Sequence, residues 1–204
     1  MEKAIILTDI QNDFIPGGAL EVARGDEVIE VANLAMKNFN HVIATQDWHP
    51  ADHKSFASQH EGKFPGEFIE LNGLPQILWP DHCVMGTRGA EFAPGLNISG
   101  ITKVIQKGIN REVDSYSGFF DNAHGHATGL EDYLRSQGID DLYIVGLATD
   151  YCVKYTAIDA RKLGFNISLI IEGVRGVELN SGDCDAAIED MKMAGVKFVS
   201  MDDF

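Results

Sequence analysis

Short apolar runs recur along the chain, and between them apolar residues repeat every three or four positions. A continuous apolar run is typical of a strand buried on both faces of a parallel sheet, whereas the longer repeat is typical of an amphipathic helix. The runs predict six strands, over residues 4–9, 41–46, 101–107, 140–146, 166–173 and 196–200. Such strands, connected through helices, indicate a parallel sheet with right-handed crossovers.

Four stretches with helical spacing lie between these strands. They span residues 26–39, 128–138, 152–164 and 181–195. Thr128, with Glu131 three residues later, is typical of a helix start, and Ser181 is the expected cap of the last helix. The order of elements predicts an α/β fold, a three-layer α/β/α sandwich around a mostly parallel six-stranded sheet.

The regular pattern is interrupted between residues 47 and 100, where prolines, glycines and histidines gather. We expect a long irregular excursion there, and loops of this length inside a compact domain usually carry function. Residues 1–204 are expected to form a single domain, because this length suits one core and no linker divides the chain.

Composition narrows the classes of partner. Hydrophobic residues make up 45% of the chain and charged residues 23%, as in ordinary globular proteins. The formal net charge of −15 argues against nucleic acid or an anionic membrane as a partner, because both need a basic surface. The 3 cysteines form no CxxC pair and nothing near the N-terminus indicates export, so we expect a cytoplasmic protein.

The predicted strands deliver reactive side chains to one edge of the sheet. Asp9, Asp47 with His49, Lys107 and the turn that contains Cys152 each stand at the end of a strand. Ligands of open α/β sheets bind outside the carboxyl ends of the strands, so these side chains are candidates for one site. Taken singly, each has an ordinary explanation, because polar residues commonly end strands.

Cys152 is the candidate nucleophile. It lies in the first turn of the predicted 152–164 helix, where free backbone N–H groups and the helix dipole favour thiolate over thiol. The Lys107 ammonium would stabilise the thiolate, and the Asp9 carboxylate could take the thiol proton and return it to a leaving group. This combination predicts a nucleophilic hydrolase without a catalytic histidine. The alternative makes Cys152 a small core residue, Lys107 a solvated lysine and Asp9 a loop cap.

A second set of residues suits a metal ion. Asp47 and His49 of the stretch DWHPADH stand two residues apart, and His82 of WPDHC could be a third ligand of a divalent metal. Three protein ligands would leave positions open for water or substrate. His53 and His60 are further candidates. The alternative is that these histidines are exposed in polar loops.

The motifs TDIQNDF, TQDWHP, WPDHC, QKG and GLATDYCV, in this order, closely resemble those of the isochorismatase-like cysteine hydrolases, and among them the nicotinamidases (pyrazinamidases). The resemblance covers nearly the whole chain. It implies an amidohydrolase that converts nicotinamide, and pyrazinamide as well, to the carboxylate and ammonia through a cysteine thioester, in NAD salvage.

The resemblance also implies roles for single residues. Asp9, Lys107 and Cys152 fall on the family's triad, and Asp47, His49 and His82 on its metal ligands. A cis peptide between Leu147 and Ala148 is implied, with the backbone N–H groups of Ala148 and Cys152 as oxyanion hole. Aromatic pocket positions of the family fall on or near Phe14, Trp79 and Tyr116. The metal would hold the pyridine nitrogen; zinc is expected, with iron and manganese as alternatives.

Other functions stay open at this point. Another amidase or an isochorismatase acting on a vinyl ether would share the topology, although isochorismatases as a group lack the cysteine and the metal ligands found here. A non-catalytic metal-binding or assembly protein with a buried, inert Cys152 is the alternative from another class. The expected partner is a small-molecule substrate, and the sequence leaves open whether the chain forms a homo-oligomer.

Overall fold

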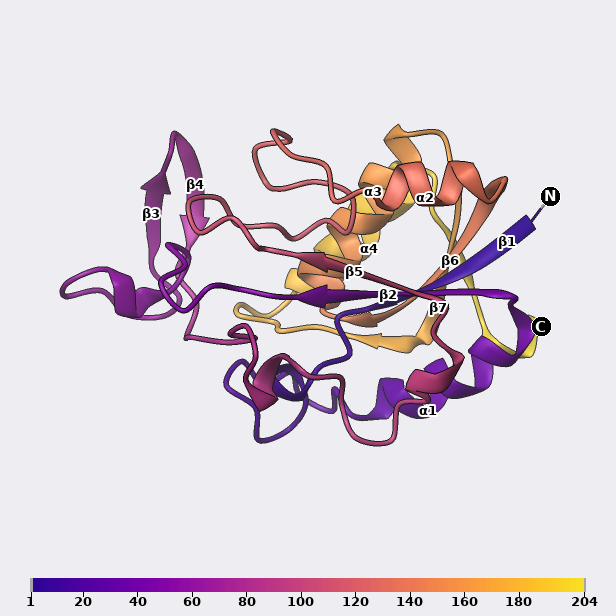
Figure 1. Ribbon diagram of the computed structural model, residues 1–204, viewed down its shortest axis with the longest axis horizontal. Coiled ribbons are helices and arrows are strands. Elements are labelled where there is room, and N and C mark those ends of the chain that lie inside the picture. The colour runs from indigo at the N-terminus through magenta and orange to yellow at the C-terminus, as the bar shows by residue number, and fades with distance from the viewer. Residues whose placement is uncertain (1, 204) are drawn as a thin grey trace.

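The computed structural model describes residues 2–203 and contains, within that range, a six-stranded sheet in which every neighbouring pair is parallel (Figure 1). The strand order across the sheet is β5-β2-β1-β6-β7-β8. The strands are β1 (Glu2–Thr8), β2 (His41–Asp47), β5 (Lys103–Lys107), β6 (Ile139–Leu147), β7 (Asn166–Arg175) and β8 (Lys197–Val199). The predicted fold class is confirmed.

Both faces of the sheet are buried, which explains the continuous apolar runs. Along β1, Ile5 and Leu7 belong to one hydrophobic cluster, whereas Ala4 and Ile6 belong to the other, and all four are fully buried. Side chains of a strand point alternately to the two faces, so a sheet covered on both sides needs apolar residues at every position.

Helices cover the two faces unequally. The helices are α1 (Glu27–Ala35), α2 (Leu130–Ser136), α3 (Lys154–Lys162) and α4 (Asp183–Met193). Helix α1 covers one face, and it buries Val28, Ala32 and Ala35 at the spacing of a single helical stripe. Helices α2, α3 and α4 lie on the opposite face (Figure 1). The result is the expected three-layer sandwich.

The excursion between β2 and β5 is more regular than the sequence analysis predicted. It contains an antiparallel hairpin of β3 (Phe68–Leu71) and β4 (Leu74–Ile77), which projects from one end of the molecule (Figure 1). Asn72 and Gly73 connect the two strands, both with positive φ, as in a type I′ turn. Short 3-10 turns lie between or beside the strands and helices of the described residues: η1 (Asn12–Phe14), η2 (Met36–Asn38), η3 (Ala57–Gln59), η4 (Arg88–Ala90), η5 (Ile98–Gly100) and η7 (Met201–Asp203).

Three predicted helix starts are wrong by a few residues. Gly129 precedes α2 in place of Thr128, although the Thr128 hydroxyl still accepts a hydrogen bond from the backbone N–H of Leu130 at 3.2 Å. Gly182, not Ser181, precedes α4. The third correction concerns the segment after β6, where a π-helical turn, η6 (Thr149–Val153), comes before α3. Cys152 therefore lies in this π-helical turn, and the α-helix begins two residues later.

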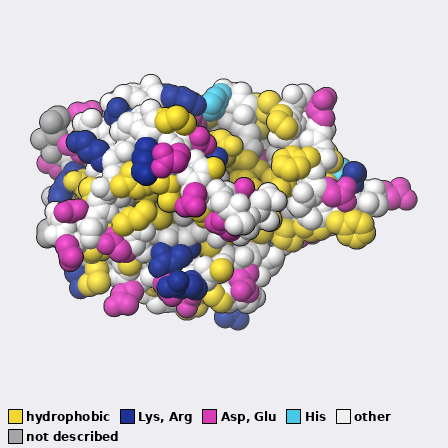
Figure 2. Space-filling view, turned by 180° about the vertical axis from the view of Figure 1, so that it is seen from behind, with side chains coloured by type: hydrophobic (Ala, Val, Ile, Leu, Met, Phe, Trp, Pro, Cys, Tyr) yellow, Lys and Arg dark blue, Asp and Glu magenta, His cyan; other side chains and the backbone are white. Residues whose placement is uncertain are grey.

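Acidic side chains are spread over the face drawn in Figure 2, and basic ones lie between them. This distribution agrees with the strongly negative formal charge. None of the helices within residues 2–203 combines the length and the apolar character needed to cross a membrane.

Candidate active site

Three of the predicted residues meet around the buried ammonium of Lys107, at the carboxyl end of β5. Its Nζ lies 2.9 Å from Asp9 Oδ2, just beyond β1, and 3.3 Å from Cys152 Sγ on η6. It also donates a hydrogen bond to the backbone carbonyl of Ser115 at 2.8 Å. The Lys107 and Asp9 side chains have no exposed surface. The sheet therefore brings together the three residues of the expected triad, from strand ends far apart in the sequence.

Asp47 connects this group to the candidate metal ligands. It ends β2, in register with Lys107 on β5, and its Oδ1 forms a short ion pair with Lys107 Nζ. The ammonium thus sits between two carboxylates. Burial alone would lower the pKa of Lys107, but Asp47 and Asp9 raise it well above its ordinary value, so the side chain stays a cation.

Asp9 is held in one orientation. The Thr45 hydroxyl donates a hydrogen bond to Asp9 Oδ1 at 2.6 Å, and the Thr45 hydroxyl oxygen accepts one from the backbone N–H of Asp9 at 3.2 Å. The residue has φ 48°, a left-handed conformation that is uncommon outside glycine and often found at functional sites. Burial, with Asp47 adding to it, raises the pKa of Asp9 although Lys107 opposes the shift. A carboxyl with a raised pKa is suited to accepting and returning a proton.

The state of Cys152 differs from the sequence-based prediction. Burial raises the pKa of its thiol well above the ordinary value, and the Lys107 ammonium only partly opposes this effect. The expected preference for thiolate rested on the first turn of an α-helix, whereas the thiol lies at a buried π-helical turn. In these surroundings the thiol is favoured over the thiolate, and a carboxylate oxygen of Asp9 lies within 4.8 Å of the Cys152 sulfur.

The three predicted metal ligands converge. Asp47 Oδ2 lies 3.5 Å from His49 Nε2 and 3.8 Å from His82 Nε2, and the three ligand atoms all lie within 4.8 Å of one another. The second nitrogen of each ring faces a backbone carbonyl: His49 Nδ1 lies 3.0 Å from the Gly108 oxygen and His82 Nδ1 lies 2.8 Å from the Pro80 oxygen. This arrangement turns both Nε2 atoms toward the centre, as in protein metal sites, so the residues fit a divalent cation.

Electrostatics suit two of these three ligands, His82 and Asp47, whereas at His49 the Asp47 carboxylate raises the pKa against the effect of burial. Burial and the neighbouring His49 lower the pKa of His82 to about 4, which leaves its imidazole neutral near pH 7. Burial would raise the pKa of Asp47, but Lys107 and His49 hold it well below the usual range. A neutral imidazole and an ionised carboxylate are the forms that coordinate metal.

The two further histidines lie in different surroundings. His53 is fully buried beside His49, with ring centroids 4.5 Å apart, and His49, His53 and Asp114 form a second group of ligand atoms within 4.8 Å of one another. Among the described residues, His53 Nε2 has no hydrogen-bond partner. His60 instead places its Nε2 2.8 Å from the backbone oxygen of Lys54.

One narrow cavity is lined by residues of both groups. Asp47, His82, Ala148 and Cys152 all line it. The peptide bond between Leu147 and Ala148 is cis, as the resemblance implies.

Aromatic side chains form the rest of this cavity's wall. The predicted residues Phe14, Trp79 and Tyr116 all line it. Trp79 Nε1 donates to the Tyr116 hydroxyl at 3.2 Å, and Tyr151 packs edge-on against both rings. Sequence reasoning missed four lining residues: Leu20, Asp114, Tyr151 and Val177. For Tyr151, its position next to Cys152 was an available signal, whereas the other three lie in loops without a periodic pattern.

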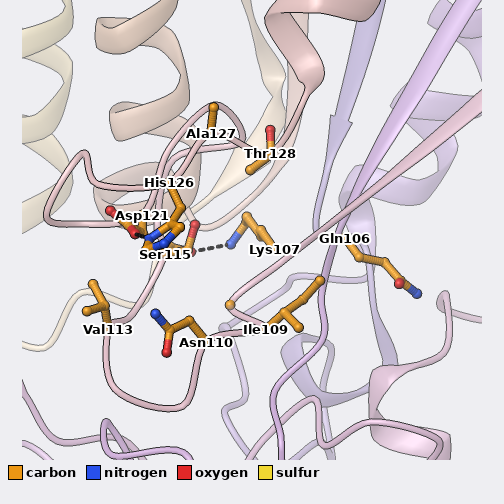
Figure 3. A pocket seen from close by; sticks show the side chains of 11 residues that line it. Gln106, Lys107, Ile109, Asn110, Val113, Ser115, Asp121, His126, Ala127 and Thr128 are labelled. Carbon is orange, nitrogen blue, oxygen red and sulfur yellow. Dashed lines mark hydrogen bonds and ion pairs between the residues drawn. The ribbon is translucent and has the colours of Figure 1, made fainter.

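A second, larger cavity lies next to Lys107. Residues 106–110 and the 113–128 loop line it, and Figure 3 shows the Lys107 side chain directed at Ser115 on its wall. Cys152 and two of the three metal candidates, Asp47 and His82, line the first cavity instead. We therefore place the candidate active site in the first cavity.

Comparison with known proteins agrees with the motifs. The isochorismatase domain model matches residues 3–203. A nicotinamidase of Escherichia coli is 47% identical over 99% of this chain and 96% of its own length. A nicotinamidase–pyrazinamidase structure from Acinetobacter baumanii superposes with a TM-score of 0.96 at 45% identity, over 99% of this chain and 97% of that one. The pyrazinamidase of Pyrococcus horikoshii, solved in complex with zinc, gives a TM-score of 0.80 at 36% identity, over 98% of this chain and 100% of that one.

The fold and the sequence match define an α/β/α protein of the hydrolase type. The chain belongs to the isochorismatase domain family.

Proposed function

We propose that this protein is an amidohydrolase that converts nicotinamide to nicotinate and ammonia, acts on pyrazinamide as well, and serves NAD salvage. One observation carries the proposal: Cys152 shares a small aromatic cavity with Asp47 and His82, and its sulfur lies 3.3 Å from a buried lysine that also binds Asp9. The identity to nicotinamidases over nearly the full length supports the choice of substrate.

The reaction begins with acylation of Cys152. Its sulfur attacks the amide carbonyl carbon while the thiol proton passes to Asp9, so the S–C bond forms as the S–H bond breaks. The cation of Lys107 stabilises negative charge on sulfur during this transfer, because it contacts both partners. We assign the backbone N–H groups of Ala148 and Cys152 to the developing oxyanion.

Asp9 then returns the proton to the amide nitrogen. The C–N bond breaks, ammonia leaves, and a thioester remains on Cys152. Water attacks the thioester carbonyl as Asp9 takes one of its protons, and that proton goes back to the departing sulfur. The raised pKa of Asp9 suits this double role, because the carboxyl must hold a proton between the two transfers.

We propose that Asp47, His49 and His82 hold one divalent metal ion, zinc first and iron or manganese as alternatives. When bound, the ion would supply a Lewis acid that accepts the lone pair of the substrate's ring nitrogen and so orients the ring. Trp79, Tyr116 and Phe14 would hold the ring faces. The zinc complex of the Pyrococcus horikoshii pyrazinamidase supports the choice of metal.

We also propose that residues 1–204 act as one hydrolase domain in the cytoplasm. Cys83, Cys152 and Cys184 are all free, in agreement with a reducing compartment.

Ammonia release from nicotinamide and from benzamide tests the function and the role of the metal together. Benzamide has the same amide and shape but no ring nitrogen. A site that pairs this nitrogen with a metal should turn benzamide over at least about 100-fold more slowly in kcat/KM. Equal kcat/KM for both amides would remove the metal from substrate binding, and ammonia release from neither would rule out the proposed reaction.

A further inference from the structure

The segment that follows β7 forms part of the substrate cavity. Val177 lies on the cavity wall together with Ala148 and Cys152. It comes two residues after the end of β7, in a stretch outside regular secondary structure. A wall residue in such a stretch keeps its place only if other contacts fix the backbone.

Asp150 provides these contacts. Its Oδ1 accepts a hydrogen bond from the backbone N–H of Val177 at 2.9 Å, and its Oδ2 accepts one from the N–H of Glu178 at 2.8 Å. Only 4% of Asp150 is exposed, so water competes little for the carboxylate. Hydrogen bonds from backbone N–H groups to an ionised carboxylate are stronger than those to a neutral acceptor.

The segment also lies close against the turn that carries Asp150. A Cβ added to Gly176 would stand 3.0 Å from Asp150 Oδ1 and 2.0 Å from Cys184 Sγ, so a larger residue at this position would push the chain away. Glu178 has φ 55°, a left-handed conformation, and its side chain accepts a hydrogen bond from Gly182 N at 2.6 Å. The chain therefore turns sharply just after the pair of contacts with Asp150.

Asp150 and Cys152 share one turn, η6. The carboxylate that fixes the cavity wall is thus two residues from the sulfur that attacks the substrate.

We propose that Asp150 is a positioning residue that holds Val177 against the substrate ring and so sets the affinity of the site for flat heteroaromatic amides. The proposal rests on the proposed function. Asp150 acts through Val177 and does not take part in bond making, since the proton transfers belong to Asp9.

The test uses Asp150→Ala, Asp150→Asn, Val177→Ala and the Asp150→Ala/Val177→Ala double variant with nicotinamide. Asp150→Ala should raise KM about 10-fold or more while kcat changes less than about threefold, because ring binding is lost before the chemistry is affected. Asp150→Asn keeps one acceptor oxygen and should lie between wild type and Asp150→Ala. The double variant should resemble Val177→Ala alone, because two residues that act through one contact are not additive.

Asp159→Ala is the matched control. Asp159 is another buried aspartate, 3% exposed, but it lies on α3 and binds His124 and Lys162. The Asp159→Ala variant should lower the melting temperature as much as Asp150→Ala does and leave the KM for nicotinamide unchanged. Hydrogen exchange adds a measurement independent of activity: the amides of Val177 and Glu178 should exchange faster in Asp150→Asn.

Unchanged exchange at these two amides, equal effects of Asp150→Ala and Asp159→Ala on KM, or additive effects of Asp150→Ala and Val177→Ala would each overturn the proposal. If Asp150→Ala does not fold, Asp150→Asn and Val177→Ala decide the question by the same criteria. If the two amides exchange faster in Asp150→Asn but the wild-type protein releases no ammonia from nicotinamide, the hydrogen bonds to Asp150 are confirmed and the proposed reaction is rejected.

Discussion

The two halves of the candidate site are built differently. Asp9, Lys107 and Cys152 stand directly at, or within a few residues of, the ends of β1, β5 and β6, so the sheet fixes them. Of the candidate metal ligands, Asp47 ends β2, but His82 arrives from the far end of the excursion after the β3–β4 hairpin. The reacting side chains are therefore held by the core sheet, whereas the candidate metal ligands depend in part on a loop that a bound ion would help to hold.

Asp47 contacts both halves. Asp47 pairs with Lys107 and also faces His49 and His82. A change confined to one half can therefore reach the other through this carboxylate.

Replacement of the nucleophile should give the largest effect. Cys152→Ala is expected to lower kcat by at least about 10⁴-fold, because the thioester route is lost, and to leave the fold intact, because Lys107 keeps both carboxylate partners. Ammonia release measures the loss of kcat, and a thermal melt measures whether the fold is intact. Cys184→Ala is the control, since Cys184 lies outside the cavity lining; if it were the inactivating change, the assignment of the nucleophile would be wrong.

Removal of the central cation should damage stability as well as activity. Lys107→Met keeps the length of the side chain but leaves Asp9 and Asp47 as buried carboxylates without their cation. Such a change costs about 3–5 kcal/mol in the free energy of unfolding. Denaturant titration is the measurement, with Lys103→Met on the same strand as an exposed control. A stability equal to wild type would show that the ammonium does not hold the two halves together.

Loss of a metal ligand should have the smallest effect on the fold. His82→Ala is expected to weaken metal binding by at least about 100-fold and to loosen the excursion, while the sheet keeps its stability. Elemental analysis gives the metal content, and hydrogen exchange compares residues 78–86 with β1. His60→Ala serves as the control. Stoichiometric metal in His82→Ala would contradict the three-ligand site.

The reacting half could be predicted from the sequence for a physical reason. Apolar runs locate buried strands, parallel strands share one polar edge, and residues at their ends must then meet. Asp9, Lys107 and Cys152 follow this rule, and the structure brings them together. Their motifs, together with those of the metal ligands, also led to the family that the comparisons show.

Other features depend on tertiary contacts that leave no local pattern in the sequence. The hydrogen bonds from Val177 and Glu178 to Asp150 join segments more than 25 residues apart, so the chain carries no spacing that reveals them. The π-helical turn likewise lacks a periodic signature, and no local pattern in the sequence shows the burial that raises the pKa of the Cys152 thiol. The hairpin is different, because Asn72–Gly73 between two short apolar stretches is a recognised turn signal that the prolines of the excursion obscured.

The central claim is that Cys152 forms a covalent bond to the carbonyl carbon of the substrate. Pyridine-3-carbaldehyde, labelled with carbon-13 at its carbonyl, tests it directly, because a thiol adds to an aldehyde and the labelled carbon becomes tetrahedral. We expect carbon-13 NMR of the wild-type protein and of Cys83→Ala to show a protein-bound tetrahedral carbon that is missing from Cys152→Ala. A protein-bound tetrahedral signal that persists in Cys152→Ala, or a wild-type spectrum with free aldehyde and free hydrate alone, would contradict the account.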